Sequence, residues 1–431
     1  MKKQLYIILL SFLFVSNLRA QQTPGAKQTS DYSIVGATAH IGNGTVIENS
    51  LLVFSNGKIT YIGKADASQQ KGTIINAIGK HVYPGLIAAN TSLGLAEIDA
   101  VRATRDFDEI GSYLPHIRSI IAYNAESKVV ESMRPNGVLI AQITPRGGVI
   151  SGTSSVVQLD AWNWEDASIN TDDAIHINWP SSFTRGRWWL GEDRGMKPNK
   201  QYAKSVTKLT DFFTNAKNYL SGKRSTKNLP YDALENVFKG TKKVFIHVNG
   251  EKAITDAVNT FLNLKIKNIV LVRAYGAEKV TELLKTNNIP VVLERAHRLP
   301  NNEDEDYDLP FRSAKILVDA GILVGLGMEG DMERMSARNI PFYAGTYGAY
   351  GLGKEKALQL ITANNAKILG IDKFAGTLET GKDATLFISE GDALDMRTNI
   401  ISNAFIQGRK VSLETHQTKL WKRYSNKFKN Q

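Results

Sequence analysis

From about residue 240 onward, the sequence alternates short apolar runs with longer segments of helical periodicity. The apolar runs are "KKVFIHVNG", "KNIVLVRAYG", "IPVVLERAH" and "GILVGLGME", and helix-period segments separate them at 251–264, 277–286 and 311–320. Strands that are apolar along their whole length are typical of a parallel sheet covered on both faces. This alternation restricts the chain to an α/β fold.

Three earlier runs, "HVYPGLIA", "GVLIAQITP" and "VVQLD", extend the pattern toward the N-terminus. About eight repeats over roughly 290 residues suit a closed (β/α)8 barrel of the TIM type better than an open sheet. We expect this barrel to occupy residues 81–370. Residues 160–240 interrupt the rhythm, so we expect an insertion there. Its tryptophans either floor a binding cleft or form a small core of their own; they are Trp162, Trp164, Trp179, Trp188 and Trp189.

Both ends of the chain that follows residue 20 carry short β runs in place of strand–helix units. In "SLLVFSNGKITYIGK", the sequence Ser-Asn-Gly-Lys at 55–58 lies between two alternating runs, which predicts a tight hairpin. Similar runs recur in "GTLETGKDATLFISEGD" and "ISNAFIQGRKVSL". We expect residues 30–80 and 371–415 to form one composite β-sandwich beside the barrel, after a polar linker at 21–31.

The first twenty residues have the pattern of a secretory signal peptide. Lys2 and Lys3 precede a short apolar run that ends at Val15, and "LRAQ" at 18–21 resembles a cleavage site. The run is too short for a stable transmembrane span, and no lipid-accepting cysteine follows it. We therefore expect a periplasmic or secreted protein that is not an integral membrane protein. The chain has no cysteine, so it forms no disulfides, and a core of this size needs none.

The formal net charge is +11, to which the signal region contributes three positive charges, leaving +8. Lysine and arginine are scattered except in the tail at 416–431, where Leu420, Trp421, Tyr424 and Phe428 recur at helical spacing among lysines. We expect a basic helix that packs on its own protein; the alternative is contact with a membrane surface or an acidic partner. An exported chain without a basic-aromatic motif argues against nucleic acid as a partner.

In a parallel barrel, chemistry is located at the C-terminal ends of the strands. The polar residues at those ends are Asn90, Ser92, His247, Arg273 and Glu329. No Gly-x-Ser-x-Gly sequence and no phosphate-binding loop accompany them, which excludes two common classes of catalytic site.

Four stretches of the chain carry a family resemblance. They read "VYPGLIAANTSLGL", "IPVVLERAHRLPNNEDEDYDLP", "SARNIPFYAGTYGAYGLGKEKALQLITANNAKILGI" and "GTLETGKDATLFISEGDALDMRTNIISNAFIQGR". Together they resemble the imidazolonepropionase-like branch of the amidohydrolase superfamily over nearly the whole mature chain. This resemblance implies a barrel hydrolase of non-peptide or cyclic C–N bonds, with a small-molecule or peptide-like substrate, and zinc or another divalent metal as cofactor.

The first strand departs from the family pattern. The family's strand ends in Asp-x-His-x-His, and the corresponding positions here are Ala88, Asn90 and Ser92. Neutral oxygen donors are poor zinc ligands, whereas imidazole, thiolate and carboxylate are good ones. The two histidines that the family uses on this strand are therefore missing.

The other ligand positions are only partly retained. By the resemblance, His247 is the fifth-strand histidine, Arg273 stands at the sixth-strand position, and Glu329, with Asp331 as fallback, replaces the last-strand aspartate. A guanidinium binds no cation, and a catalytic zinc site needs three protein ligands. His247 and Glu329 are the remaining ligand-type residues, and we assign no metal.

Each of these residues has two interpretations. His247 is either a retained ligand or a core histidine bonded to a neighbour. Arg273 either has a role in the site, as an anchor for a substrate carboxylate or a partner for Glu329, or forms an ordinary ion pair at the barrel rim. Glu329 is a general base unless that arginine lowers its pKa. Without a metal, we expect Asn90 and Ser92 to join these three residues in one polar network, because buried polar groups need partners.

Two functions follow from these residues. The first is an exported hydrolase of C–N bonds that works weakly, with another metal or without one; Glu329, Asp331 and His247 are its catalytic candidates, and Arg273, Asn90 and Ser92 its substrate-binding candidates. The second is a barrel without catalysis that binds a ligand or pairs with an active relative, as a homo- or hetero-oligomer.

Overall fold

The computed structural model describes residues 23–193, 195–222, 226–301, 304–330 and 332–429. The expected signal peptide at 1–20 lies outside the described residues, and so does the fallback carboxylate Asp331.

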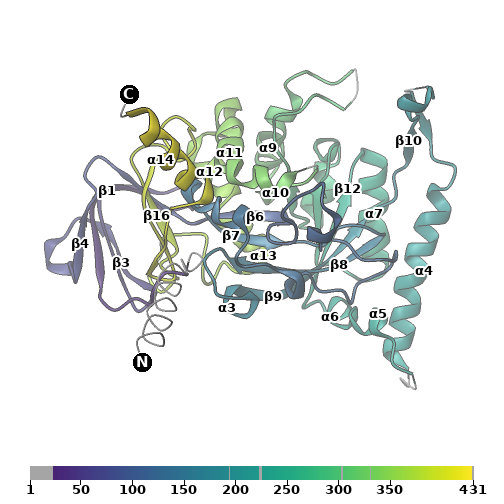
Figure 1. The fold of residues 1–431 in the computed structure, drawn as a ribbon. Helices are drawn as coiled ribbons and strands as arrows, with labels where there is room; N and C mark the ends of the chain where they lie inside the picture. The colour runs from purple at the N-terminus through teal and green to yellow at the C-terminus, as the bar shows by residue number, and fades with distance from the viewer. Residues whose placement is uncertain (1–22, 194, 223–225, 302–303, 331, 430–431) are drawn as a thin grey trace, which may run out of the picture.

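An eight-stranded sheet forms a barrel in the middle of the molecule (Figure 1). Its strand order is β15-β14-β13-β12-β9-β8-β7-β6. A parallel bridge between Ala89 and Gly327 brings the two edges together, so the barrel is nearly closed and the TIM-like expectation is confirmed. The strands are β6 (Leu86–Thr91), β7 (Val138–Ile143), β8 (Ile150–Gln158), β9 (Ser168–Asn178), β12 (Lys243–Val248), β13 (Ile269–Arg273), β14 (Val291–Leu293) and β15 (Val324–Leu326).

The barrel differs from the sequence expectation in two strands. β8 runs antiparallel to both of its neighbours, so the sheet is not wholly parallel. β9 lies within residues 160–240, the segment that we expected to be an insertion. Its first five residues are polar or only half-buried, and it pairs with β8 without a long helix between them, so no strand–helix rhythm marks it.

The remainder of 160–240 stands outside the barrel. It comprises α3 (Trp164–Ala167), the β10–β11 hairpin (Phe183–Arg185 and Met196–Pro198), α4 (Tyr202–Ser221), α5 (Leu229–Asp232) and α6 (Glu235–Phe238). Trp179 is buried and donates to the Tyr202 hydroxyl at 3.1 Å, whereas Trp162 and Trp189 are about two-thirds exposed. Trp162 and Trp189 therefore lie at the surface, whereas Trp179 and the partly buried Trp164 pack in the main hydrophobic core, so these four tryptophans form no separate core of their own.

The helices between the later strands form where periodicity predicts them. α7 (Glu251–Asn263) buries Ala253, Ile254, Ala257, Val258 and Phe261, which recur on one face at helical spacing. The others in this half are α8 (Thr281–Thr286), α9 (Leu309–Asp319), α10 (Glu333–Ser336), α11 (Ile340–Tyr347), α12 (Lys354–Leu360) and α13 (Ala363–Leu369), and α2 (Lys128–Glu131) precedes β7.

The two chain ends meet in a second eight-stranded sheet. β5 (His81–Pro84) pairs antiparallel with β16 (Leu386–Ser389), which joins the N-terminal strands to the C-terminal ones. β5 is the first half of "HVYPGLIA", so the barrel begins after Gly85 and not at residue 81. That this sheet folds into a two-layer sandwich stays a prediction. The other strands are β1 (Tyr32–His40), β2 (Val46–Ser55), β3 (Lys58–Lys64), β4 (Thr73–Asn76), β17 (Ile401–Ile406) and β18 (Arg409–Lys410).

The predicted hairpin at 55–58 is confirmed. Asn56 and Gly57 have φ angles of 49° and 80°, so both central residues are left-handed, as a type I′ turn requires. The turn connects β2 to β3, which pair antiparallel.

The C-terminal helix, α14 (His416–Lys429), lies on the outside of the molecule at the same end as the small sheet (Figure 1). None of its described residues is fully buried, and its apolar side chains Leu420, Trp421, Tyr424 and Phe428 are exposed. No helix in the described part of the chain has the length and hydropathy needed to cross a bilayer.

Candidate functional site

The barrel brings four of the predicted site residues together on one carboxylate. Asn90 Nδ2 donates to Glu329 Oε2 at 3.2 Å, and His247 Nδ1 lies 2.9 Å from the same oxygen. Arg273 Nη1 donates to Glu329 Oε1 at 3.2 Å. Asn90 and His247 come from the exits of β6 and β12, Arg273 ends β13, and Glu329 follows β15. The strand ends therefore converge as the barrel geometry predicts.

Ser92 is not a direct member of this cluster. Its backbone N–H donates to Glu333 Oε1 at 2.8 Å, and its hydroxyl donates to the same oxygen. Arg146 connects the two groups, because its Nη1 donates to Asn90 Oδ1 at 2.8 Å and its Nη2 lies 3.4 Å from Glu333. The expected five-residue network thus holds for four residues, and Ser92 joins it only through Glu333 and Arg146.

Sequence reasoning missed three charged residues of the site. Glu294 directly follows β14, and Arg146 follows β7 by three residues, so the strand-end rule could have found both. Glu333 lies on α10, and no sequence signal marks it as a partner of Ser92.

Two carboxylates hold the Arg273 guanidinium, and their environments shift their pKa values in opposite directions. Arg273 Nε donates to Glu294 Oε1 at 3.2 Å. Burial raises the pKa of Glu294, and the nearby arginine only partly offsets this. Burial also acts to raise the pKa of Glu329, but His247, Arg146 and Arg273 together hold it well below its ordinary value. Glu329 is therefore a fixed negative charge, and Glu294 is the carboxyl that more readily gains a proton.

A chain of hydrogen bonds leads from His247 into the barrel interior. His247 Nε2 lies 3.0 Å from His176 Nδ1, and His176 Nε2 lies 2.9 Å from the Ser154 hydroxyl. Ser154 donates to Asp173 Oδ1 at 2.6 Å. Burial raises the pKa of Asp173 to about 6 and lowers that of His176 well below its ordinary value. No role for His176 is evident from sequence.

The direction of these hydrogen bonds depends on Asp173. When Asp173 is ionised, Ser154 donates to it and accepts from His176. When Asp173 is protonated, it can donate to Ser154, and Ser154 can then donate to His176.

The backbone is strained where two of these side chains are presented. Asn90 has a φ of 51°, Arg273 of 67° and Ala274 of 48°, all in the left-handed region. Asparagine tolerates that region, but arginine and alanine adopt it at a cost of about 1–2 kcal/mol each. Such strain is concentrated at functional sites, where surrounding structure holds it in place.

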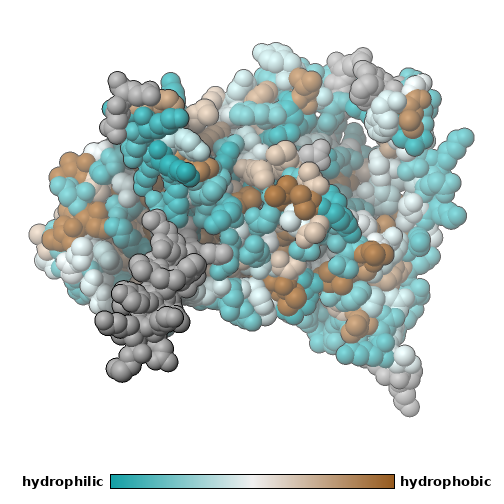
Figure 2. All heavy atoms as spheres, in the orientation of Figure 1, coloured by the Kyte–Doolittle hydropathy of each residue, from teal (hydrophilic) through white to brown (hydrophobic). Residues whose placement is uncertain are grey.

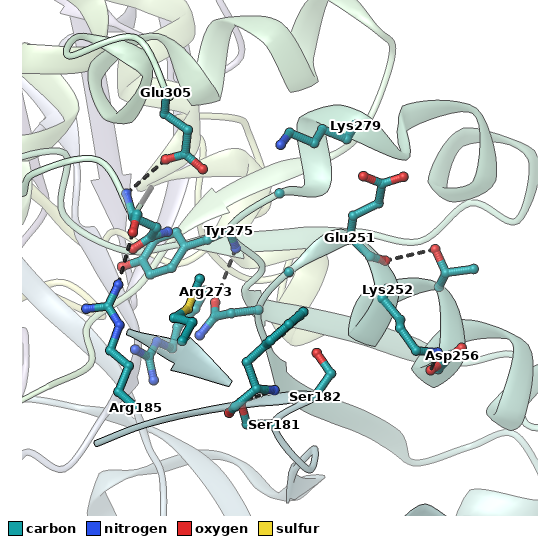
Figure 3. A pocket seen from close by; sticks show the side chains of 17 residues that line it. Ser181, Ser182, Arg185, Glu251, Lys252, Asp256, Arg273, Tyr275, Lys279 and Glu305 are labelled. Atoms are coloured by element: carbon teal, nitrogen blue, oxygen red, sulfur yellow. Dashed lines mark hydrogen bonds and ion pairs between the residues drawn. The ribbon is translucent and has the colours of Figure 1, made fainter. Parts of the chain in front are cut away.

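A cavity of about 760 Å³ opens beside Arg273 (Figure 3). The β10–β11 hairpin, the start of α7 and the segment after β13 form its walls. Arg185, Lys252 and Lys279 line it together with Glu251 and Tyr275. Among the tryptophans whose side chains are described, which are Trp162, Trp164, Trp179 and Trp189 in this segment, none lines the cavity.

The donor set at the strand ends does not fit a divalent cation. Both ring nitrogens of His247 are engaged by other side chains, and the Asn90 amide bonds to Glu329 and Arg146. Two guanidinium groups, those of Arg146 and Arg273, contact the cluster and would repel a metal ion. Among the described residues, no group of three or more His, Asp or Glu is placed to hold a metal.

Comparisons with known proteins point to one family. Residues 224–416 match the model of the amidohydrolase family. The 5-methylthioadenosine/S-adenosylhomocysteine deaminase of Thermoanaerobacter pseudethanolicus is 23% identical over 382 residues, which cover 80% of this chain and 82% of that protein.

Solved structures share the fold. An amidohydrolase from Thermotoga maritima has a TM-score of 0.76 at 22% identity, covering 88% of this chain and 99% of that one. An adenosine deaminase from Xanthomonas campestris with bound zinc has a TM-score of 0.53 at 14% identity, covering 93% and 98%. If this chain is active, it is a hydrolase acting on C–N bonds. The family match supports a relation to the amidohydrolases, and the solved structures show that this chain shares their fold.

Proposed function

We propose that this chain is an exported hydrolase of a C–N bond in a small molecule, of the imidazolonepropionase-like branch, in which protein side chains replace the metal of the family. The observation that supports this is the position of Arg273. It lines the cavity, and two carboxylates hold its guanidinium at the strand ends, at the position that by the family resemblance carries a metal ligand.

Arg273 binds the substrate in this proposal. Its contacts with Glu294 and Glu329 use the Nε and Nη1 protons, and a guanidinium has five N–H donors in all. The remaining donors are available to a carbonyl or carboxylate oxygen of the substrate. A fixed positive charge there stabilises the negative charge that develops on a carbonyl oxygen under attack.

Glu294 moves the proton. Hydrolysis consumes one water, whose oxygen bonds to the carbon of the C–N bond, a carbonyl carbon in an amide or a ring carbon in an aminopurine, as that bond breaks and a water proton passes to the leaving nitrogen. A carboxyl with a raised pKa is suited to accept and return that proton. Glu329, ionised throughout, holds Arg273 and orients His247.

Turnover by the mature chain tests this proposal. A panel of cyclic amides, proline dipeptides and aminopurine nucleosides is assayed for released amine or ammonia. We expect at least one class to be hydrolysed, Arg273→Met to abolish turnover, and Glu294→Gln to lower it about 100-fold. Glu282→Gln, an exposed glutamate on α8, is the matched control. Absence of turnover across the panel would favour the ligand-binding alternative.

The metal content of the purified protein tests separately whether side chains have replaced the metal. Elemental analysis after purification in zinc-supplemented buffer is expected to give well under one equivalent. One stoichiometric zinc that is lost in His247→Ala would overturn this part of the proposal.

Export is tested by cell fractionation and by N-terminal sequencing of the mature protein, whose first residue is expected near Gln21.

A further inference from the structure

The helix α14 exposes a row of large apolar side chains. Leu420, Trp421, Tyr424 and Phe428 are 37%, 67%, 54% and 64% exposed. At 100° per residue, they fall within an arc of about 100° on one side of the helix. Exposed apolar rows on a helix mark a surface that binds something.

The cations of α14 occupy the rest of its circumference. They are Lys419, Lys422, Arg423, Lys427 and Lys429, and the helix contains no acidic residue. Glu414, just before the helix, pairs with Lys419 and Lys422. Among the described residues, Arg423, Lys427 and Lys429 form no ion pair. The face of α14 turned to the viewer in Figure 2 is accordingly hydrophilic.

The helix is fastened to the protein at one end and along a narrow polar side. The His416 backbone N–H donates to Glu131 Oε1 of α2 at 2.6 Å, and Thr415 is buried. Within the described helix only Thr418 and Ser425 are half-buried. These two small residues lie seven apart, on the side that faces the protein. At 100° per residue the apolar row lies beside this attached side of the helix and not on it, so its four side chains remain exposed.

We propose that α14 binds the surface of an anionic phospholipid bilayer. The apolar row inserts at the boundary between headgroups and acyl chains, and the flanking lysines and arginine meet the lipid phosphates. A short helix with tryptophan and tyrosine in its apolar row and only cations on its polar face has the composition of an interfacial helix. A partner protein would need an apolar groove for the aromatic row with acidic groups on both sides of it. An anionic lipid surface supplies both the apolar environment and the negative charge without needing a specific shape.

Vesicle flotation of the mature chain tests the proposal. Phosphatidylcholine vesicles are compared with vesicles containing about 30% phosphatidylglycerol, a typical anionic fraction. We expect binding to the anionic vesicles alone, and a decrease of about tenfold or more in the partition coefficient for Trp421→Ser/Phe428→Ser and for Lys422→Gln/Lys427→Gln. Raising the salt to about 0.5 M should also reduce binding, because it screens the phosphates.

Matched variants control for changes in hydrophobicity and charge. Trp162→Ser removes a tryptophan that is 65% exposed elsewhere, and Lys204→Gln/Lys217→Gln removes two exposed charges from α4. Both are expected to bind like the wild type. Equal binding of wild type and Trp421→Ser/Phe428→Ser, with unchanged unfolding temperatures, would overturn the proposal. A second outcome would also overturn the proposal: the wild type does not bind vesicles, and light scattering shows a dimer that Trp421→Ser/Phe428→Ser abolishes.

Discussion

Arg273 and Glu329 form an ion pair across the mouth of the barrel, with Nη1 3.2 Å from Oε1. Glu294 holds the same guanidinium at Nε, so the cation is fixed between two strands. A positive charge fixed in this position governs both the affinity of the site for metals and its proton chemistry.

Restoring the family histidines should not restore metal binding while Arg273 remains. In Asn90→His/Ser92→His, the guanidinium groups of Arg146 and Arg273 would still lie at the cluster, so we expect well under one equivalent of zinc by elemental analysis. Adding Arg273→His removes one of these two cations and supplies a further imidazole, so it should increase zinc uptake. Tight zinc binding by the double variant alone would show that Arg273 does not exclude metal from the site.

The pH dependence of turnover should report Glu294. If this carboxylate is the base, kcat/KM rises with pH as Glu294 loses its proton, and its raised pKa places that rise above the range of an ordinary glutamate. Arg273 acts to lower this pKa. In Arg273→Gln, the pH at which the remaining activity rises should therefore be higher than in the wild type, by about 1 pH unit or more. An unchanged profile in a pH–rate measurement would assign the proton step to another group.

Asp173 should make the protein less stable as the pH rises from about 4 to 7. Its pKa is raised to about 6, so the folded state binds more protons than the unfolded chain between the two pKa values. At pH values below its pKa in the unfolded chain, Asp173 contributes about 3 kcal/mol to the free energy of unfolding. This contribution is lost as the pH rises through about 6.

Asp173→Asn mimics the protonated carboxyl, because its amide can donate to Ser154 and accept from Gln142. We expect it to raise the free energy of unfolding at pH 7.5 by about 1–3 kcal/mol and to flatten its pH dependence. Urea denaturation from pH 4.5 to 7.5 measures both, with the exposed Asp211→Asn as control. A destabilised variant with an unchanged slope would contradict the assignment.

Asp160 should be essential for attachment of the C-terminal strands. It is buried and pairs with Arg134 at 2.6 Å and with Arg409 of β18 at 3.1 Å. Its side chain also accepts from the Gly25 backbone N–H at 2.8 Å. Asp160→Ala would leave two largely buried guanidinium groups without their anion, so we expect a loss of about 3–5 kcal/mol in the free energy of unfolding. Urea denaturation beside Asp211→Ala measures it; a loss below about 1 kcal/mol would contradict this role.

The strands that sequence reasoning found are those with a simple pattern. β12, β13, β14 and β15 are apolar over most of their length and are separated by segments of helical period, so both signals agree. β9 escaped because its first half is polar and its partner β8 is antiparallel, which removes the connecting helix that marks a βα unit. A strand of this kind is recognisable only by its pairing.

The sequence by itself determined the α/β barrel, the Asn-Gly hairpin and the polar residues at the strand ends, because these depend on local periodicity, on backbone preferences and on the position of a residue along its own strand. Only the tertiary structure decided which of those residues touch. Ser92 lies two residues after Asn90, yet it bonds to Glu333, while Asn90 bonds to Glu329. The left-handed backbone at Asn90 separates the two side chains, and their partners come from segments about 240 residues away, set by barrel closure, which no local pattern encodes.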